Sequence, residues 1–409
     1  MKDKKEIIIT GGEFFNKGAQ AMSYMTIDRI KKEFPQHQLL FASDLDMKRA
    51  TSEKAKYNFE MINNPYRRGP YPGENIVRKM LGKKLVSKKV KRDLTNIEYL
   101  FDISGYALST QGGKKGWKKT KHLLAEHEKA LDHGTKVVIM PQSIGPFFYQ
   151  DEASSAVVRK AVKKVLSKVN VLFVREKQGL AELQEQVGIK HAIYSPDLVL
   201  TNRQKLDMNH IYRDGEPQLK TYKVKENAVA IVPNRRNNKN GNEAENLVAY
   251  SMIINKLLDH QKEVYIISHS ADDVAMCQKV AQAYTENPKV HLITADLTPN
   301  EFEKLISQFE FAIASRFHSI VHAYKEGVPC VLMGWAVKYH ELATLFNQDA
   351  YVVDVRSADI SEQLSSAVIK MLDHVETERD TIKHVLTTHQ YADPFDIAFK
   401  ALKQSSSQR

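Results

Sequence analysis

An arginine and a histidine that could bind and protonate an anion lie two residues apart after an apolar run in the second half of the chain. The run 311–314 is followed by Ser315, Arg316 and, one residue further on, His318. The planar guanidinium fork of arginine suits phosphate and carboxylate groups. Histidine titrates near neutral pH and can exchange a proton with a bound molecule. The alternative is structural, with Arg316 paired to an acid and His318 at a helix cap.

The residues around this pair predict a strand followed by a helix. Upstream, residues 298–301 combine a hydroxyl cap, a proline and a carboxylate three residues after the cap, which is typical of a helix start. Downstream, Gly327 and Pro329 stop a helical pattern. The pair therefore lies where a buried strand meets a helix N-terminus, and α/β sheets bind ligands, anions in particular, at such places.

A second arginine is expected at the same edge of the same sheet. Arg235 follows the strand-like run 229–232, and Arg236 comes directly after it. The carboxyl ends of parallel strands meet at one edge, so Arg235 or Arg236 can converge with Arg316 and His318 on one ligand. Such a set suits a small dianion that carries a phosphate and a carboxylate.

Two loops in the first half also follow predicted strands. The glycine-containing loop 10–20 lacks the G-x-G-x-x-G spacing, which argues against a dinucleotide site and leaves a tight turn or a substrate-lining loop. In 141–146, two prolines around a glycine make a stiff loop that could position Gln142. Arg175 and Glu176, at a further strand end, are better explained as a structural pair.

Strand-like runs alternate with helical patterns along most of the chain, which predicts parallel βα units. This alternation lapses in a polar stretch and starts again at residue 228. We therefore predict an N-terminal domain over 1–205, a second domain over 226–375, and a helical segment over 376–409 that could cross back to the first.

Composition sets further limits. The chain has 409 residues, a net charge of +11 and only two cysteines, so neither a disulfide scaffold nor a zinc site is expected. The N-terminus carries no pattern of a signal peptide or membrane span, which predicts a cytoplasmic protein. We expect no metal and no cofactor.

Residues 66–92 form a basic insertion in the first domain. Its ten basic residues are Arg67, Arg68, Arg78, Lys79, Lys83, Lys84, Lys88, Lys89, Lys91 and Arg92, against the single acid Glu74. Charge runs of this kind are often solvated loops or helix faces. The alternative is a contact surface for anionic lipid headgroups or an anionic glycan, and hence a peripheral position at the inner face of the membrane. Nucleic acid is disfavoured because no recognition motif accompanies the charge.

The order and spacing of these motifs resemble the polysaccharide pyruvyl transferase family over about residues 6–345. The motifs are 10–20, 141–146, 174–176, 195–198, 233–235, 315–319 and 327–329. The resemblance implies two Rossmann-like domains similar to GT-B glycosyltransferases, an acceptor domain followed by a donor domain, with the active site in the cleft between them. It also implies phosphoenolpyruvate as donor and a pair of sugar hydroxyls, free or lipid-linked, as acceptor. The product would be a pyruvate ketal on a cell-surface polysaccharide or its precursor.

The resemblance also implies roles for single residues. Arg316 and His318 match the family's Arg-x-His at the donor site, and Arg235 matches its arginine after the first strand of the second domain. The two arginines would hold the donor, and His318 would protonate the methylene carbon or assist phosphate departure. Ser315, Lys338 and Gln142 are further candidate substrate-binding residues, and Glu13 or Asp102 is a candidate base.

Two alternatives stay open. One is a GT-B glycosyltransferase that uses a nucleotide sugar, although 315–319 contains no carboxylate for sugar hydroxyls. The other is an inactive scaffold of a polysaccharide-assembly complex that docks through 66–92. The chain departs from the family pattern at 16–19 and 101–105, so the acceptor sugar stays undetermined.

Overall fold

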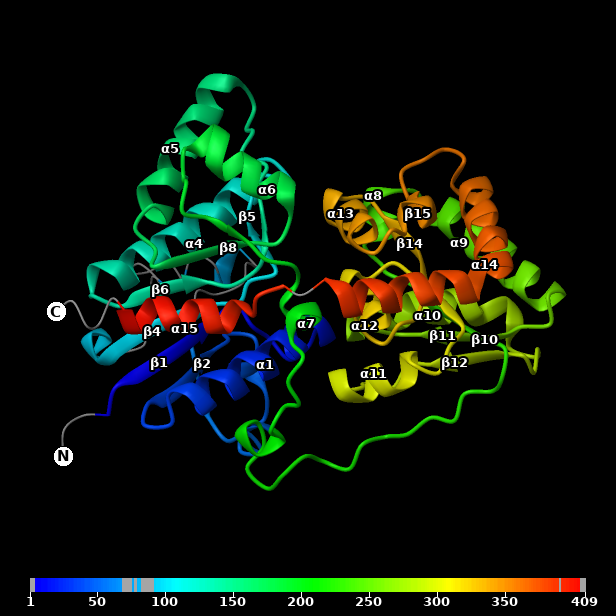
Figure 1. Ribbon diagram of the computed structural model, residues 1–409, viewed down its shortest axis with the longest axis horizontal. Coiled ribbons are helices and arrows are strands. Elements are labelled where there is room, and N and C mark those ends of the chain that lie inside the picture. Colours follow the sequence, from blue (N-terminus) through cyan, green and yellow to red (C-terminus); the bar gives the residue numbers. More distant parts are fainter. Residues whose placement is uncertain (1–3, 68–75, 77–78, 82–91, 390, 405–409) are drawn as a thin grey trace. The chain divides into compact units, whose positions relative to one another are not determined.

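The computed structural model describes residues 4–67, 76, 79–81, 92–389 and 391–404 (Figure 1). The chain divides into two compact units. Unit 1 comprises residues 1–14, 21–217 and 391–409, and unit 2 comprises residues 15–20 and 218–390. Each unit is built around its own parallel sheet.

The sheet of unit 1 has seven strands in the order β3-β2-β1-β4-β6-β8-β9, all parallel. The strands are β1 (Glu6–Thr10), β2 (Gln38–Ala42), β3 (Glu60–Ile62), β4 (Ile97–Asp102), β6 (Lys136–Ile139), β8 (Val171–Val174) and β9 (Ile193–Tyr194). All five residues of β1 are buried, as expected for a parallel strand covered on both faces. A separate pair is formed by β5 (Tyr106–Leu108) and β7 (Ser143–Ile144).

The helices of unit 1 connect these strands. They are α1 (Lys17–Glu33, whose first residues belong to unit 2), α2 (Thr51–Lys54), α4 (Lys114–Asp132), α5 (Glu152–Leu166), α6 (Lys177–Ala181), α7 (Leu198–Thr201) and α15 (Pro394–Gln404). A π-helical turn, Glu182–Val187, follows α6 directly.

The sheet of unit 2 has six parallel strands in the order β12-β11-β10-β13-β14-β15. The strands are β10 (Ala228–Val232), β11 (Glu263–Ile267), β12 (Val290–Ile293), β13 (Phe311–Ala314), β14 (Cys330–Gly334) and β15 (Val352–Asp354). The helices are α8 (Asn237–Asn240), α9 (Glu243–Asp259), α10 (Val274–Ala281), α11 (Pro299–Ile306), α12 (Phe317–Lys325), α13 (Val337–Leu345) and α14 (Ile360–Thr388). The spatial order is that of a Rossmann sheet, and unit 1 shares it over six strands.

Several elements that local sequence signals predicted are present in the structure. Thr298 caps α11 through a capping box with Glu301, and Pro299 opens the helix, which confirms the predicted start. α12 ends at Lys325, and Gly327 then adopts a positive φ of 73°. Both cysteines are buried free thiols.

The C-terminal part differs from the predicted boundary at 375/376. The helix α14 continues through that point to Thr388, because it packs along its length against α9, β14 and β15 of unit 2. The chain joins unit 1 only from Tyr391 onward. Among the described residues, no helix is long and apolar enough to cross a membrane.

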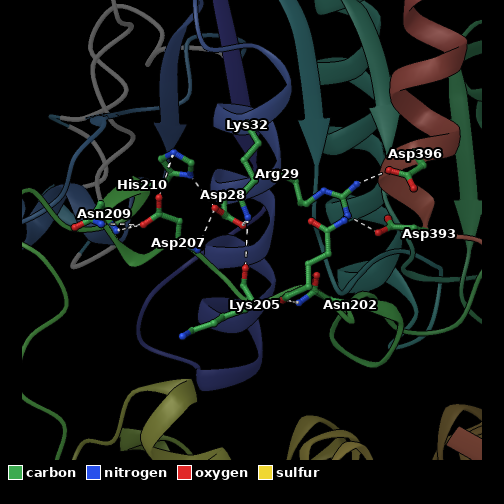
Figure 2. Close-up of polar contacts among 11 residues, drawn as sticks. Asp28, Arg29, Lys32, Asn202, Lys205, Asp207, Asn209, His210, Asp393 and Asp396 are labelled. Atoms are coloured by element: carbon green, nitrogen blue, oxygen red, sulfur yellow. Dashed lines mark hydrogen bonds and ion pairs between the residues drawn. The ribbon is translucent and has the colours of Figure 1, made fainter. Parts of the chain in front are cut away.

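The helix α1 anchors two distant segments to unit 1 (Figure 2). Arg29 is buried, pairs with Asp393 and Asp396, and lies 5.1 Å from the ring centroid of Phe395 at the start of α15. The neighbouring residue Asp28, which is also fully buried, accepts a 2.7 Å contact from His210 in the stretch that follows α7. Long-range ion pairs thus tie both segments to α1.

Candidate functional site

Arg316 and His318 lie at the junction of β13 and α12, where the sequence predicted a strand end and a helix start. Arg316 is the N-cap residue of α12 and is only 7% exposed. His318 is the second residue of the helix and is partly exposed. The backbone N–H groups of a first helical turn have no partner within the helix, so this place favours an anion.

Arg316 forms a buried ion pair with Asp273. Its Nε and Nη2 atoms donate to the two carboxylate oxygens of Asp273 at 2.6 and 2.7 Å, and Asp273 is fully buried. The structural role foreseen for Arg316 is therefore present. A guanidinium has five N–H groups, and the guanidinium of Arg316 makes no other hydrogen bond among the described residues. Arg316 can hold Asp273 and still donate to a ligand.

Asp273 also connects the loop that carries Arg235. The backbone N–H of Arg235 donates to Asp273 at 3.1 Å. The Arg235 side chain is 47% exposed and pairs with Asp272 at 3.1 Å. The loops after β10 and β13 are thus joined through one carboxylate, and the exposed guanidinium of Arg235 can turn to a ligand at small cost.

The first loop of the chain contributes two features to unit 2. Asn16 forms a bridge with Ser270, and Lys17 is 4% exposed and pairs with Asp296. A Cβ atom on Gly18 would lie 2.1 Å from Cγ and Nδ1 of His318. Only glycine therefore lets the imidazole pack against this backbone. The sequence suggested a substrate-lining loop here but gave no sign that it adjoins residue 318.

Sequence reasoning also missed His269, which follows β11. It is 1% exposed, and within the described part of the chain neither of its ring nitrogens has a hydrogen-bond partner. Burial lowers the pKa of His269 well below its usual value, and the nearby His322, Arg316, His318 and Lys17 lower it further. His269 is therefore a neutral imidazole beside several cationic or titratable groups.

Lys17, His269, Arg316 and His318 together make up what we call the cationic cluster. Its members come from the first loop, the end of β11 and the junction of β13 with α12. Lys17 and Arg316 are its buried cations, and His269 is its neutral member. Cations close to a helix N-terminus favour an anion such as a phosphate or carboxylate.

Ser315 and Lys338, two predicted substrate-binding residues, lie beside this cluster. Ser315 is fully buried, and its hydroxyl lies 2.8 Å from that of Tyr250. Its carbonyl accepts from Asn234 and Tyr339 at 3.0 Å each, so Ser315 fixes the shape of the loop. Lys338 lies with its Nζ atom 5.1 Å from the ring centroid of Phe317. Their contacts with a substrate stay predictions.

Gln142 lies in unit 1, next to Asp102. Gln142 is fully buried and donates to Asp102 at 3.4 Å. Asp102 is also fully buried, accepts from the backbone of Ser104 at 2.8 Å and lies 3.1 Å from His127. Burial works against ionisation, but His127 and Ser104 outweigh it and lower the pKa of Asp102. An enclosed carboxylate of this kind is a weaker candidate base than Glu13, which lines a cavity.

Two members of the basic insertion are structural. Arg67 pairs with Glu126 at 2.8 Å and Asp44 at 2.5 Å, and Arg92 pairs with Glu6 and Glu60. Of the ten basic residues, Lys79 is the only other one that the structure describes. Arg68, Arg78, Lys83, Lys84, Lys88, Lys89 and Lys91 lie outside the described residues. No cluster of three or more potential metal ligands occurs in the part of the chain that the structure describes.

The fold is that of the GT-B-like enzymes, which have two Rossmann-type sheets. S. aureus MnaA in its co-structure with UDP matches with a TM-score of 0.54 and 12% identity, covering 98% of this chain and 95% of that one. A putative UDP-N-acetylglucosamine 2-epimerase from Listeria monocytogenes matches with a TM-score of 0.55 and 11% identity, covering 99% and 97%. Trehalose-6-phosphate synthase OtsA matches with a TM-score of 0.52 and 9% identity, covering 98% and 99%. At sequence identities this low, the matches show a similarity of fold alone.

The family is given by the sequence. The family model for polysaccharide pyruvyl transferase matches residues 16–336. The chain therefore belongs to the polysaccharide pyruvyl transferase family, as its motifs had suggested, and the family indicates a pyruvyl transferase enzyme. A search of the curated proteins found no match.

Proposed function

We propose that this protein transfers a pyruvyl group from phosphoenolpyruvate to two hydroxyls of one sugar, forming a cyclic ketal. The cationic cluster is the observation that carries the proposal. Phosphoenolpyruvate carries its phosphate and its carboxylate on the same carbon atom. Arg316 presents free N–H donors to such a ligand, beside Lys17 and a helix N-terminus.

The proposed reaction needs one acid and one base. His318 donates a proton to the methylene carbon of the enol, which leaves C2 electrophilic. One sugar hydroxyl adds to C2 and the second displaces phosphate, while a base takes up the hydroxyl protons. Arg235, Arg316 and Lys17 stabilise the negative charge on the carboxylate and on the departing phosphate. No cofactor or metal takes part in this scheme.

Thermal-shift titration tests the donor. We expect phosphoenolpyruvate to raise the melting temperature of the native protein, because a ligand that binds only the folded state stabilises it. UDP-sugars should leave the melting temperature unchanged. Stabilisation by UDP-sugars alone would favour a nucleotide-sugar glycosyltransferase instead, and no response to any of them would favour an inactive scaffold.

The role of His318 has its own test. His318→Asn should lower kcat by about 100-fold or more, as loss of a general acid does, while phosphoenolpyruvate still raises the melting temperature. Exposed His340, on the neighbouring helix α13, offers the matched control His340→Asn, which should keep native turnover. A His318→Asn enzyme with native kcat would remove His318 from the mechanism.

We further propose a cytoplasmic enzyme that meets a lipid-linked acceptor at the inner face of the membrane through 66–92. In support, Ile76, Met80 and Leu81 expose 68%, 82% and 60% of their surface in this basic segment. Flotation with phosphatidylglycerol vesicles should recover the native protein, and Met80→Glu with Leu81→Glu should reduce the recovered fraction. Equal recovery of the two proteins would contradict the membrane contact.

A further inference from the structure

A polar cavity of about 370 Å³ lies at the carboxyl edge of the sheet in unit 1. Its volume falls within the range of roughly 300–1,000 Å³ that is usual for small-molecule sites. It is lined by Thr10, Gly11, Gly12, Glu13, Ala42, Ser43, Asp44, Leu45, Lys48, Asn64, Arg67, Ser104, Leu123 and Glu126. Thr10 and Ala42 end β1 and β2, and the other lining residues follow β1, β2, β3 or β4 or belong to α4. Between β1 and β4 the strand order reverses, and open α/β sheets bind ligands at that point.

One wall of the cavity is a network of paired side chains. Arg67 donates to Glu126 at 2.8 Å and to Asp44 at 2.5 Å. Asn64 donates to the other oxygen of Glu126 at 2.8 Å, and its backbone N–H donates to Asp44 at 3.1 Å. Burial raises the pKa of Glu126, although Arg67 opposes this. The charge of Arg67 is thus shared between two carboxylates.

The rest of the lining offers hydroxyl and backbone groups. Thr10, Ser43 and Ser104 contribute hydroxyls, and Gly11 contributes an exposed backbone with a φ of 80°. A Cβ on Gly11 would lie 2.3 Å from Ser104 Oγ and 2.7 Å from Asp102 Oδ1. Glycine therefore keeps this side of the cavity open.

The lining chemistry selects the class of ligand. Three carboxylates against Lys48 and the paired Arg67 disfavour an anion such as phosphoenolpyruvate. Most lining side chains are polar or charged, and Ala42, Leu45 and Leu123 add apolar contacts. A neutral molecule that carries many hydroxyls can donate to the carboxylates and accept from the amide and hydroxyl groups at once.

We propose that this cavity binds one monosaccharide unit of the acceptor. The inference rests on the proposed pyruvyl transfer for the identity of its ligand as an acceptor. Glu13 is the lining carboxylate that is not bound to Arg67 among the described contacts. It accepts a hydroxyl hydrogen bond from the sugar.

Saturation-transfer NMR on the full-length protein tests the cavity. The probes are the methyl glycosides of glucose, galactose, mannose, N-acetylglucosamine and N-acetylmannosamine. Leu123→Trp places a bulky ring at the cavity, and Ala125→Trp, at an exposed position on the same helix, is its matched control. Glu13→Gln keeps the volume and removes the charge.

The expected result is saturation transfer to at least one glycoside with the native protein and with Ala125→Trp, and at least a tenfold weaker effect with Leu123→Trp. Glu13→Gln, which changes no volume, should also weaken it. The proposal would be overturned if Leu123→Trp and Glu13→Gln both gave as much saturation transfer as the native protein. It would also be overturned if the native protein gave no transfer to any glycoside.

Phosphoenolpyruvate separates this proposal from the proposed function. Its thermal shift should be the same in the native protein, Leu123→Trp and Ala125→Trp, because the cationic cluster is in unit 2. If glycosides bind at the cavity and phosphoenolpyruvate never stabilises the protein, the donor is wrong and the sugar site stands. If phosphoenolpyruvate stabilises the protein and no glycoside binds at the cavity, the proposed donor stands and the proposed sugar site is wrong.

Discussion

The two sheets share one strand order but carry different sets of polar side chains at their carboxyl edges. In unit 2 the edge gathers Lys17, His269, Arg316 and His318. In unit 1 the same edge gathers the carboxylates of Glu13, Asp44 and Glu126 with Lys48 and Arg67, and Arg67 pairs with Asp44 and Glu126. The backbone topology fixes where a ligand can bind. The side chains at the strand ends decide whether that ligand is an anion or a neutral sugar.

Two glutamates, one in each unit, also differ in their surroundings. In unit 2, burial opposes ionisation of Glu303, but His322 and Lys325 bind it and lower its pKa to about 2. In unit 1, burial raises the pKa of Glu126 despite its contact with Arg67. A carboxylate in unit 2 is thus held ionised by its cationic surroundings, whereas one in unit 1 is partly desolvated among other acids.

Removal of Arg316 should have the largest effect on this contrast. Arg316→Ala leaves Asp273 buried without its partner, so we expect a loss of about 3–5 kcal/mol in the free energy of unfolding. Urea denaturation measures it. The control is Arg235→Ala, whose exposed pair with Asp272 should contribute about 0–1 kcal/mol. Equal stabilities of the two variants would show that the buried pair does not hold the site together.

Glu303→Gln should have the second-largest effect on stability. The folded pKa of about 2 lies below the usual 4.5, so the ionised glutamate stabilises the protein above about pH 4.5 by up to about 3 kcal/mol. This contribution is lost as the pH falls toward 2. Melting temperatures of the native protein and the variant, measured from pH 7 to pH 3, should differ most at pH 7. A difference that stays constant over this range would contradict the lowered pKa.

Gly18→Ala should have an intermediate effect that falls mainly on turnover. The new Cβ would overlap the imidazole of His318, and an overpacked site typically costs about 1–3 kcal/mol. We expect kcat to fall while the melting temperature drops by a few degrees. Gly105→Ala is the control in unit 1, because its Cβ meets only Met22 at 3.6 Å. Native kcat in Gly18→Ala would show that the position of His318 does not depend on this backbone.

Glu126→Gln should have the smallest effect and the opposite dependence on pH. A raised folded pKa means that the folded state binds the proton more readily, so the native protein gains stability relative to the variant as the pH falls through that pKa. At pH 7 the two should differ by about 1 kcal/mol or less, because Arg67 keeps Asp44 as a partner. A difference that shrinks on acidification, as predicted for Glu303, would remove the contrast between the two glutamates.

Much of this organisation could be predicted from local patterns. Buried strands such as 311–314 are short apolar runs, and the start of α11 follows from Thr298, Pro299 and Glu301 alone. Because a strand end and the helix that follows are adjacent in the chain, the place of Arg316 and His318 in the fold was also predictable.

The partners of these residues were not predictable, because they are distant in sequence. Asp273 lies 43 residues before Arg316, and a polar residue at that distance gives no local signal of pairing. The predicted helical segment from 376 was wrong at its start for the same reason. Contacts of α14 within unit 2 extend the helix to Thr388, and Arg29 then holds the segment that follows in unit 1.

The sequence by itself determined the alternation of strands and helices, the family, and the strand ends at which Arg235, Arg316 and His318 lie. These follow from apolar periodicity and capping, which act over a few residues. Only the tertiary structure decided that Gly18 packs against His318 and that His269 is neutral beside them. Burial and charge at one point depend on segments that hundreds of residues of chain separate, and only folding brings them together.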